Sequence, residues 1–159
     1  MTGQENANII EKHLQDHDWK YERTDTPTGA VFTGGVGGLG GAYDSVKFAA
    51  LAEENFIQSY AILPAKAKEK LPEMAQFLHG ANYGMKQGAF ELDWADGEVR
   101  FHMSYPDCVL LTEDKDACLL ALLVLPAKMI GQYSKGIAAI LLGLATPEDA
   151  LKMCEGEES

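Results

Sequence analysis

Two histidines are the first residues in the chain that could do chemistry. His13 and His17 stand four residues apart near the end of a predicted helix, with Asp16 beside them. That spacing places two imidazoles on one helical face, where both could bind one metal ion. A metal site needs further ligands, and neither a HExxH motif nor another candidate accompanies the pair. We therefore predict no metal site and expect both side chains to face solvent.

A glycine-rich run, GGVGGLGGAYD at residues 34–44, could in principle cradle a phosphate. A Walker loop, however, ends in Gly-Lys followed by Ser or Thr, and a dinucleotide-binding loop opens a helix. Neither condition is met, because the residues that follow are rich in strand formers. We predict a flexible link between strands and no bound cofactor.

Acidic and thiol side chains supply the remaining candidates. Glu91 and Asp93 share a strand face like the paired acids of a glycosidase, but His102 and Arg100 are their expected cross-strand partners. Cys108 lies in a connection, and no histidine is tied to it by spacing. The sequence therefore predicts no catalytic residue.

Composition bounds the class of protein. The chain has 159 residues, 47% of them hydrophobic and 23% charged, which is typical of one globular domain. We expect that domain to cover residues 1–154 and residues 155–159 to form a disordered acidic tail. The net charge of −11 repels phosphate backbones and anionic lipid, so nucleic acid and membrane partners are not expected.

Cysteine usage and the N-terminal residues indicate the compartment. The three cysteines are odd in number and lack CxxC spacing, and no basic stretch followed by an apolar one stands at the start. The longest apolar run, Cys118–Leu125, is far shorter than the roughly 20 residues of a membrane span. We predict a cytoplasmic protein.

Hydrophobic periodicity predicts the elements of the first half. Apolar residues at helical spacing indicate a helix from about Glu5 to Asp16, and the TPTG turn at 26–29 indicates a hairpin. Strand-forming runs flank a turn at 53–55. A second helix spans about 71–82, with Pro72 in its first turn.

The segment from Gly88 to Tyr105 predicts a second hairpin around a two-residue Asp96–Gly97 turn. That turn sets a register with apolar pairs on one side and polar pairs on the other. The apolar pairs are Trp94 with Val99, Leu92 with Phe101 and Phe90 with Met103. The polar pairs are Asp93 with Arg100 and Glu91 with His102.

The last third predicts helices. Thr112 is expected to cap a third helix that contains the apolar run CLLALLVL, and Pro126 is expected to kink or split it. Thr146 and Pro147 begin a last short helix that runs to about Met153. The predicted fold is α+β, with an antiparallel sheet flanked by helices in the order α-β-β-β-α-β-β-α-α.

Residues 64–105 contain a PEMAxFL helix, an ANYG helix end and a GxFExDxxDGEVR hairpin. This segment resembles the bacterial YbjN family, whose members are described as candidate sensory transduction regulators. TPEDAL at 146–151 resembles the last helix of that family, and Tyr43 before a strand fits its middle. In weaker form the similarity covers most of the chain.

The resemblance implies a fold like that of the type III secretion chaperones, which are often dimeric. It implies no established activity and carries over no functional residue. The third helix of the family is more polar than CLLALLVL, and Pro126 is a further departure.

Two hypotheses about function follow. The first is a bacterial non-enzymatic regulator or chaperone-like module that presents a sheet face or a helical groove to another polypeptide. The alternative is an enzyme or small-ligand protein whose site assembles from distant residues, such as His102, Glu91, Tyr43 and Cys108.

We also predict a homodimer, because CLLALLVL offers more apolar surface than one layer of a small domain needs. Its interface is expected around Leu119, Leu122, Leu123 and Ile130.

Overall fold

A computed structural model describes residues 1–156 and has the predicted α+β class. The strands form one antiparallel sheet in the order β1-β2-β3-β4-β6-β5. They are β1 (Glu22–Thr26), β2 (Gly29–Val36), β3 (Val46–Ala52), β4 (Phe56–Lys66), β5 (Ala89–Leu92) and β6 (Glu98–Pro106). The helices are α1 (Gly3–Asp16), α2 (Leu71–Asn82), the 3-10 helix η1 (Asp107–Leu111), α3 (Lys115–Leu141) and α4 (Pro147–Glu155).

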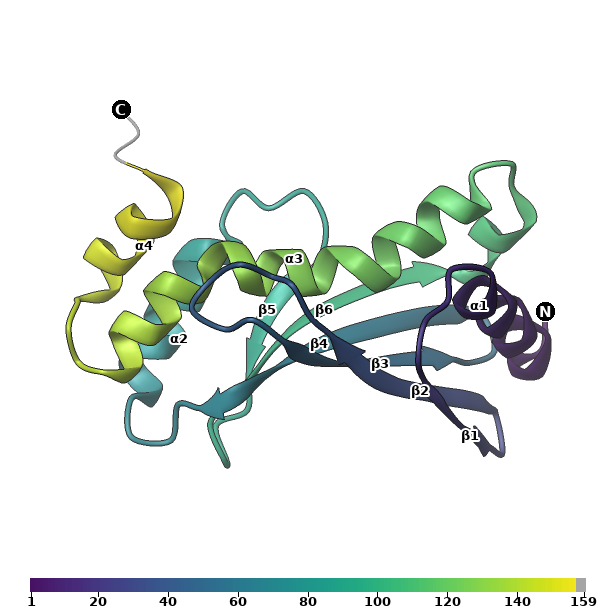
Figure 1. The fold of residues 1–159 in the computed structure, drawn as a ribbon, viewed down its shortest axis with the longest axis horizontal. Coiled ribbons are helices and arrows are strands. Elements are labelled where there is room, and N and C mark those ends of the chain that lie inside the picture. The colour runs from purple at the N-terminus through teal and green to yellow at the C-terminus, as the bar shows by residue number, and fades with distance from the viewer. Residues whose placement is uncertain (157–159) are drawn as a thin grey trace.

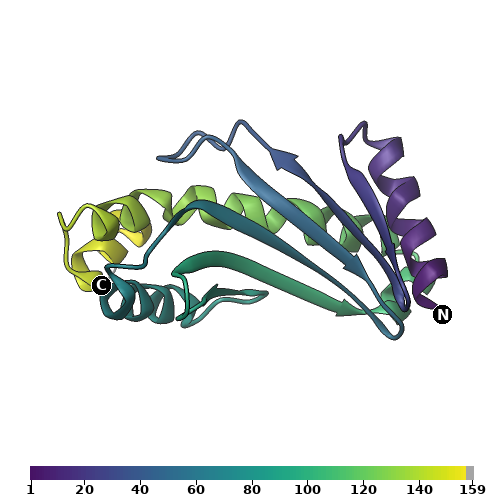
Figure 2. The same cartoon turned by 90° about the horizontal axis from the view of Figure 1, so that it is seen from below.

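α1, α2 and α3 pack on one side of the sheet, and α4 packs against α2 and α3. α1 lies over β2 and β3, α2 contacts β5, and α3 crosses β3, β4 and β6. Figures 1 and 2 show α3 running along the length of the sheet. Four strands precede α2, whereas the predicted order has three. The two strand-forming runs predicted on either side of the turn at 53–55 are β3 and β4, and the hairpin before the glycine-rich link supplies both β1 and β2.

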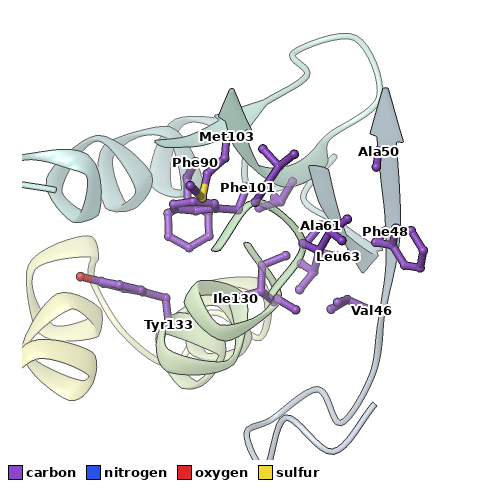
Figure 3. Packing of buried hydrophobic residues seen from close by; sticks show 14 of the residues in the cluster. Val46, Phe48, Ala50, Ala61, Leu63, Phe90, Phe101, Met103, Ile130 and Tyr133 are labelled. Atoms are coloured by element: carbon purple, nitrogen blue, oxygen red, sulfur yellow. The ribbon is translucent and has the colours of Figure 1, made fainter. Parts of the chain in front are cut away.

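The core lies between the sheet and α3 (Figure 3). Phe90 and Phe101 meet edge to face with ring centroids 5.0 Å apart, and Tyr133 of α3 meets Phe90 at 5.4 Å. Ile130 of α3 and Ala61 of β4 are at most 1% exposed. Such aromatic and aliphatic contacts across two layers are the main source of stability in a domain of this kind.

Pro126 lies inside α3, and the helix is neither split nor ended there. Proline has no N–H, so the carbonyl oxygen of Leu122, four residues earlier, loses its helical hydrogen bond. The hydroxyl of Ser59 on β4 donates a hydrogen bond to this oxygen instead, in a buried position. The sheet thus replaces the bond that the proline removes, which is consistent with α3 continuing through Pro126 where a split was one of the two predicted outcomes.

The second hairpin forms, but the predicted register is wrong by two residues. Leu92 pairs with Val99 and Phe90 with Phe101. The connection has four residues rather than two, closed by hydrogen bonds from Gly97 N to Asp93 O (2.7 Å) and from Asp93 N to Glu98 O (2.9 Å).

Two aspartates account for this longer connection. Asp93 Oδ1 accepts from Ala95 N at 2.8 Å and Asp96 Oδ1 from Glu98 N at 3.0 Å, as in Asx turns, and only Gly97 has a positive φ. Trp94 therefore sits at the tip, 60% exposed, instead of facing Val99. A shift of two residues keeps every other side chain on its predicted face.

The glycine-rich link between β2 and β3 is docked on α3. Ala42 N donates a hydrogen bond to Ser134 Oγ at 2.9 Å, and Ser134 Oγ donates to Gly131 O at 2.8 Å. A Cβ on Gly41 would stand 2.2 Å from Ser134 Oγ, so only glycine allows this approach. Figure 1 shows the link crossing α3.

Two expectations about the C-terminal third need correction. Thr112 ends η1 and does not cap α3, whose N-cap is Asp114. Glu155, predicted to belong to the tail, is the last residue of α4 and accepts a hydrogen bond from Tyr133 Oη at 2.6 Å. The remainder of the predicted tail, 157–159, lies outside the described residues.

Candidate functional site

The sheet has one face that the helices cover and one that they leave open. Along β3, β4 and β6, buried residues alternate with residues that are half-buried or exposed. The outward residues form what we call the open face, arranged in three cross-strand rows. The first row is Gly35, Lys47, Ile62, Arg100 and Glu91, the second Thr33, Ala49, Tyr60 and His102, and the third Val31, Leu51, Gln58 and Ser104.

Tyr60 is the centre of the polar part of the open face. Its ring stacks on His102 with centroids 4.6 Å apart and planes 20° apart. The guanidinium carbon of Arg100 lies 4.1 Å from the same ring centroid, within the range of a cation–π interaction. The Tyr60 hydroxyl donates to Gln58 Oε1 at 3.0 Å, and partial burial raises the pKa of this hydroxyl. It therefore stays protonated at neutral pH.

Glu91 contacts both Arg100 and His102. Arg100 Nε donates to Glu91 Oε1 at 2.7 Å, and His102 Nδ1 lies 3.3 Å from Glu91 Oε2. His102 Nε2 lies 3.1 Å from Gln58 Oε1. The predicted polar pairs are not the strand partners, because Glu91 lies opposite Arg100, and His102 lies opposite Ala89. The contact between Glu91 and His102 is a diagonal one between side chains. Each of these groups therefore has a partner within the cluster.

A shallow depression of about 720 Å³ lies beside this cluster, over β2, β3 and β4. Ala49 and Ile62 line its apolar part, and Lys20 and Lys47 stand at its sides. Gly35, which has no side chain, leaves space in the depression, since a Cβ there would meet only Val46 O, at 3.8 Å. The depression therefore depends on a missing side chain.

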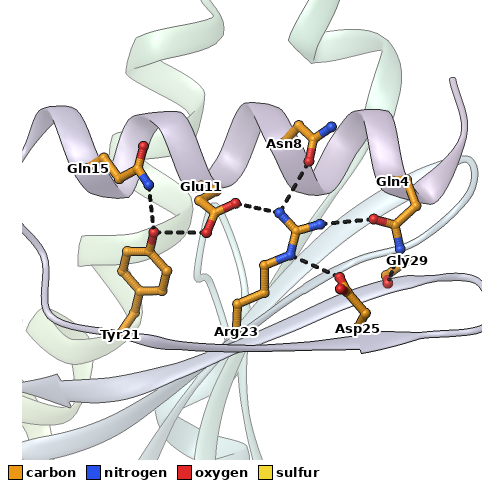
Figure 4. A network of polar contacts seen from close by, with 8 residues as sticks. All are labelled: Gln4, Asn8, Glu11, Gln15, Tyr21, Arg23, Asp25 and Gly29. Carbon is orange, nitrogen blue, oxygen red and sulfur yellow. Dashed lines mark hydrogen bonds and ion pairs between the residues drawn. The ribbon is translucent and has the colours of Figure 1, made fainter.

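Hydrogen bonds to α1 hold the segment at the rim of the depression (Figure 4). Tyr21, which lines the depression, donates from its hydroxyl to Glu11 Oε1 at 2.9 Å and accepts from Gln15 Nε2 at 3.0 Å. Arg23 donates to Glu11 and, at 2.9 Å, to Asp25 Oδ1. The rim is fixed to a helix rather than carried on a free loop.

The two histidines of α1 lie elsewhere and do not form a metal site. His13 is buried, contrary to expectation, and its ring stacks on His17 with centroids 4.1 Å apart. Its Nε2 has no hydrogen-bond partner, and burial followed by the charge of His17 lowers the pKa of His13. Within residues 1–156, no group of three histidine, cysteine or acidic side chains could hold a metal ion.

The four residues of the alternative hypothesis are only partly brought together. His102 and Glu91 are adjacent on the open face. Tyr43 belongs to the link docked on α3, at the end of the sheet where β3 begins. Cys108 lies in η1, at the opposite end of β3, next to the turn that contains Asn55. No single site contains all four.

The four side chains predicted for a dimer interface belong to the core of the single chain. Leu119, Leu122, Leu123 and Ile130 are between 0% and 2% exposed. The apolar surface that we expected them to offer a second chain is therefore used against the sheet of their own chain. The apolar run CLLALLVL suggests an interface only if the sheet buries a narrow side of the helix, and the sequence does not show how much of the helix the sheet buries.

α3 is also long and apolar enough, by length and composition, to cross a membrane. Its buried side packs against β3, β4 and β6, and a core helix of this length passes the same test. The expectation of no membrane span, which rested on the shorter run at 118–125, therefore needs this qualification.

Comparison of the chain with family models, curated proteins and solved structures found no match. The resemblance to the YbjN family remains an expectation from the motifs between residues 64 and 105.

The sequence carried a usable signal for the open face. Gln58, Tyr60 and Ile62 alternate with core residues in β4, and Gly35 stands in a strand, where glycine commonly marks a close approach or a gap. Which alternating positions meet across strands depends on register, which the sequence does not specify for β3 and β4.

Proposed function

We propose that the protein is a non-enzymatic binding module that presents the open face of its sheet to another polypeptide. The observation that supports this proposal is a broad uncovered face with half-buried apolar side chains, among them Val31, Leu51 and Ile62. Surfaces that combine such side chains with polar and aromatic groups are typical of protein interaction sites.

The state of the ionisable groups on this face also favours binding over turnover. Arg100 and His102 each contact Glu91, so these charged and polar side chains are held to one another on the surface of the sheet. A cytoplasmic regulator or chaperone-like role, as the YbjN resemblance implies, is consistent with this arrangement.

Site-specific crosslinking tests the proposal. A photoreactive amino acid replaces Tyr60 on the open face in one variant, and Gln132 on the exposed side of α3 in a matched control. We expect irradiation in a bacterial lysate to give a defined crosslinked polypeptide from the Tyr60 position and not from the Gln132 position. Equal labelling at both positions would contradict a role for the open face.

Activity measurements test the non-enzymatic part separately. We expect no hydrolysis of generic ester, phosphate ester or nucleic acid substrates by the purified protein, and no metal near stoichiometry by elemental analysis. Hydrolysis that disappears in the His102→Ala or the Cys108→Ala variant would overturn it.

A further inference from the structure

The charges around the depression differ from those of the rest of the chain. The chain carries a net charge of −11, yet two lysines and one glutamate, Glu22, line this depression. Other cationic side chains of the open face and the rim of the depression form ion pairs. Arg23 pairs with Glu11, and Arg100 pairs with Glu91. Among the described residues, Lys20 and Lys47 have no acidic partner within 4.0 Å.

Both lysines line the depression together with apolar side chains. Lys47 pairs directly with Gly35 on one strand and with Ile62 on the next, so a cation and an apolar side chain are neighbours in one row. Lys20 precedes β1 and lines the same depression as Gly35 and Lys47. Ala49, in the second row of the open face, also has a small side chain that leaves space above the sheet.

We propose that the depression over Gly35 binds an acidic peptide segment in which a carboxylate stands next to a large apolar side chain. The apolar side chain fills the space above Gly35, Ala49 and Ile62, and the carboxylate lies between Lys20 and Lys47. The inference rests on the proposed function, because it specifies the partner of the open face. Charge complementarity favours an acidic occupant, and burying an apolar side chain supplies most of the affinity.

A labelled peptide tests this inference directly. The probe is a fluorescein-labelled hexapeptide of glutamates with two leucines, and its binding to the full chain is measured by fluorescence anisotropy at low salt. Two companion peptides carry serine in place of both leucines, or glutamine in place of every glutamate. We expect both companions to bind at least about fivefold more weakly than the probe, since each lacks one of the two contacts.

Three variants of the protein locate the site. Gly35→Val fills the depression without changing charge, and its new Cβ has room, so the fold is expected to tolerate it. Lys47→Glu reverses a charge at the side of the depression. Lys128→Glu is the matched control, because Lys128 is exposed on α3 and away from the open face. Gly35→Val and Lys47→Glu should each weaken binding by about fivefold or more, and Lys128→Glu should not.

The possible outcomes separate this inference from the proposed function. Binding that is unchanged in Gly35→Val, or equal for the probe and the glutamine peptide, overturns the inference. If the probe fails to bind while the Tyr60 crosslink still captures a polypeptide, the inference about the depression is contradicted and the proposed function of the open face is not. If both fail, the open face is not the binding surface. Circular dichroism of each variant confirms that it is folded.

Discussion

At the scale of single residues, His13 has the least usual environment in the chain. It is 4% exposed, its Nε2 has no hydrogen-bond partner, and it stacks on His17. On its own helix it faces Asp16 and His17, and from α3 Asp116 approaches its Nδ1 at 4.0 Å. Burial is the largest influence, and it disfavours the imidazolium.

We therefore predict that His13 makes stability depend on pH below its ordinary pKa of 6.5. The pKa is lowered in the folded chain, so below that pH the unfolded chain binds a proton that the folded chain resists. The free energy of unfolding should fall as the pH drops from 7.5 to 5.5. Urea denaturation of His13→Gln should show a flatter profile, whereas His79→Gln, at an exposed position of α2, should keep the wild-type slope.

Gly41 supplies a second residue-scale prediction. Gly41→Ala would bring a Cβ to 2.2 Å from Ser134 Oγ and 2.8 Å from Gly131 O. The link must move from α3 and lose the bond to Ser134, at an expected cost of about 1–3 kcal/mol in thermal unfolding.

Gly37→Ala is the matched control in the same link, since it meets nothing within 4 Å. Its effect should be within about 0.5 kcal/mol. Equal effects of the two substitutions would show that the docking of the link contributes nothing to stability.

At the scale of elements, Ser59 and Pro126 act as a pair. Removing the hydroxyl in Ser59→Ala leaves the buried carbonyl oxygen of Leu122 without a donor, which should cost about 1–3 kcal/mol. In a Pro126→Ala background the helix supplies its own N–H, so the same Ser59→Ala change should cost less. A double-mutant cycle in urea measures the coupling. Strictly additive effects would mean that the serine does not substitute for the helical bond.

The elements were largely predictable, and their pairing less so. The helix at 71–82 and the turn at 53–55 follow from periodicity and turn residues, which are local. The hairpin at 89–106 was assigned to the right faces but the wrong partners, because Asp93 and Asp96 close a four-residue connection by side-chain hydrogen bonds. The survival of α3 through Pro126 depends on Ser59, which lies 63 residues away from Leu122, so no local pattern indicates it.

The candidate site is likewise predictable where it depends on local sequence and not where it depends on strand pairing. Alternation predicts correctly that Glu91, Arg100 and His102 share one face of the sheet, although the predicted cross-strand partners are wrong. Their contact with Tyr60 and the depression at Gly35 were not predicted, because both require the register of β2, β3 and β4.

At the scale of the whole molecule, the homodimer stays a prediction, but its interface must lie elsewhere than predicted. The buried leucines of α3 are not available, but Leu120 is 47% exposed on its outer side and Leu111 of η1 is 72% exposed. We expect light scattering at micromolar concentration to give a dimer mass. Leu120→Glu should shift that mass toward the monomer by placing a charge in an apolar contact.

A control for the dimer uses the other end of the same helix. Leu142 follows α3 and is 71% exposed, so Leu142→Glu adds the same charge away from the expected contact. It should leave the mass unchanged. A monomer mass for the unaltered protein would contradict the prediction.

The position of α3 in the chain has a consequence for synthesis on the ribosome. All six strands are complete by Pro106, but the helix that covers β4 and β6 extends from Lys115 to Leu141. At roughly 5–20 residues per second, the ribosome needs about 1–5 s to make α3. During that interval, Ala61 and Phe101 of the nascent sheet have no helix above them. No helix has to be added to the open face, whereas the opposite face lacks its cover until α3 is made. A stalled or truncated chain would therefore expose apolar surface on both sides of the sheet.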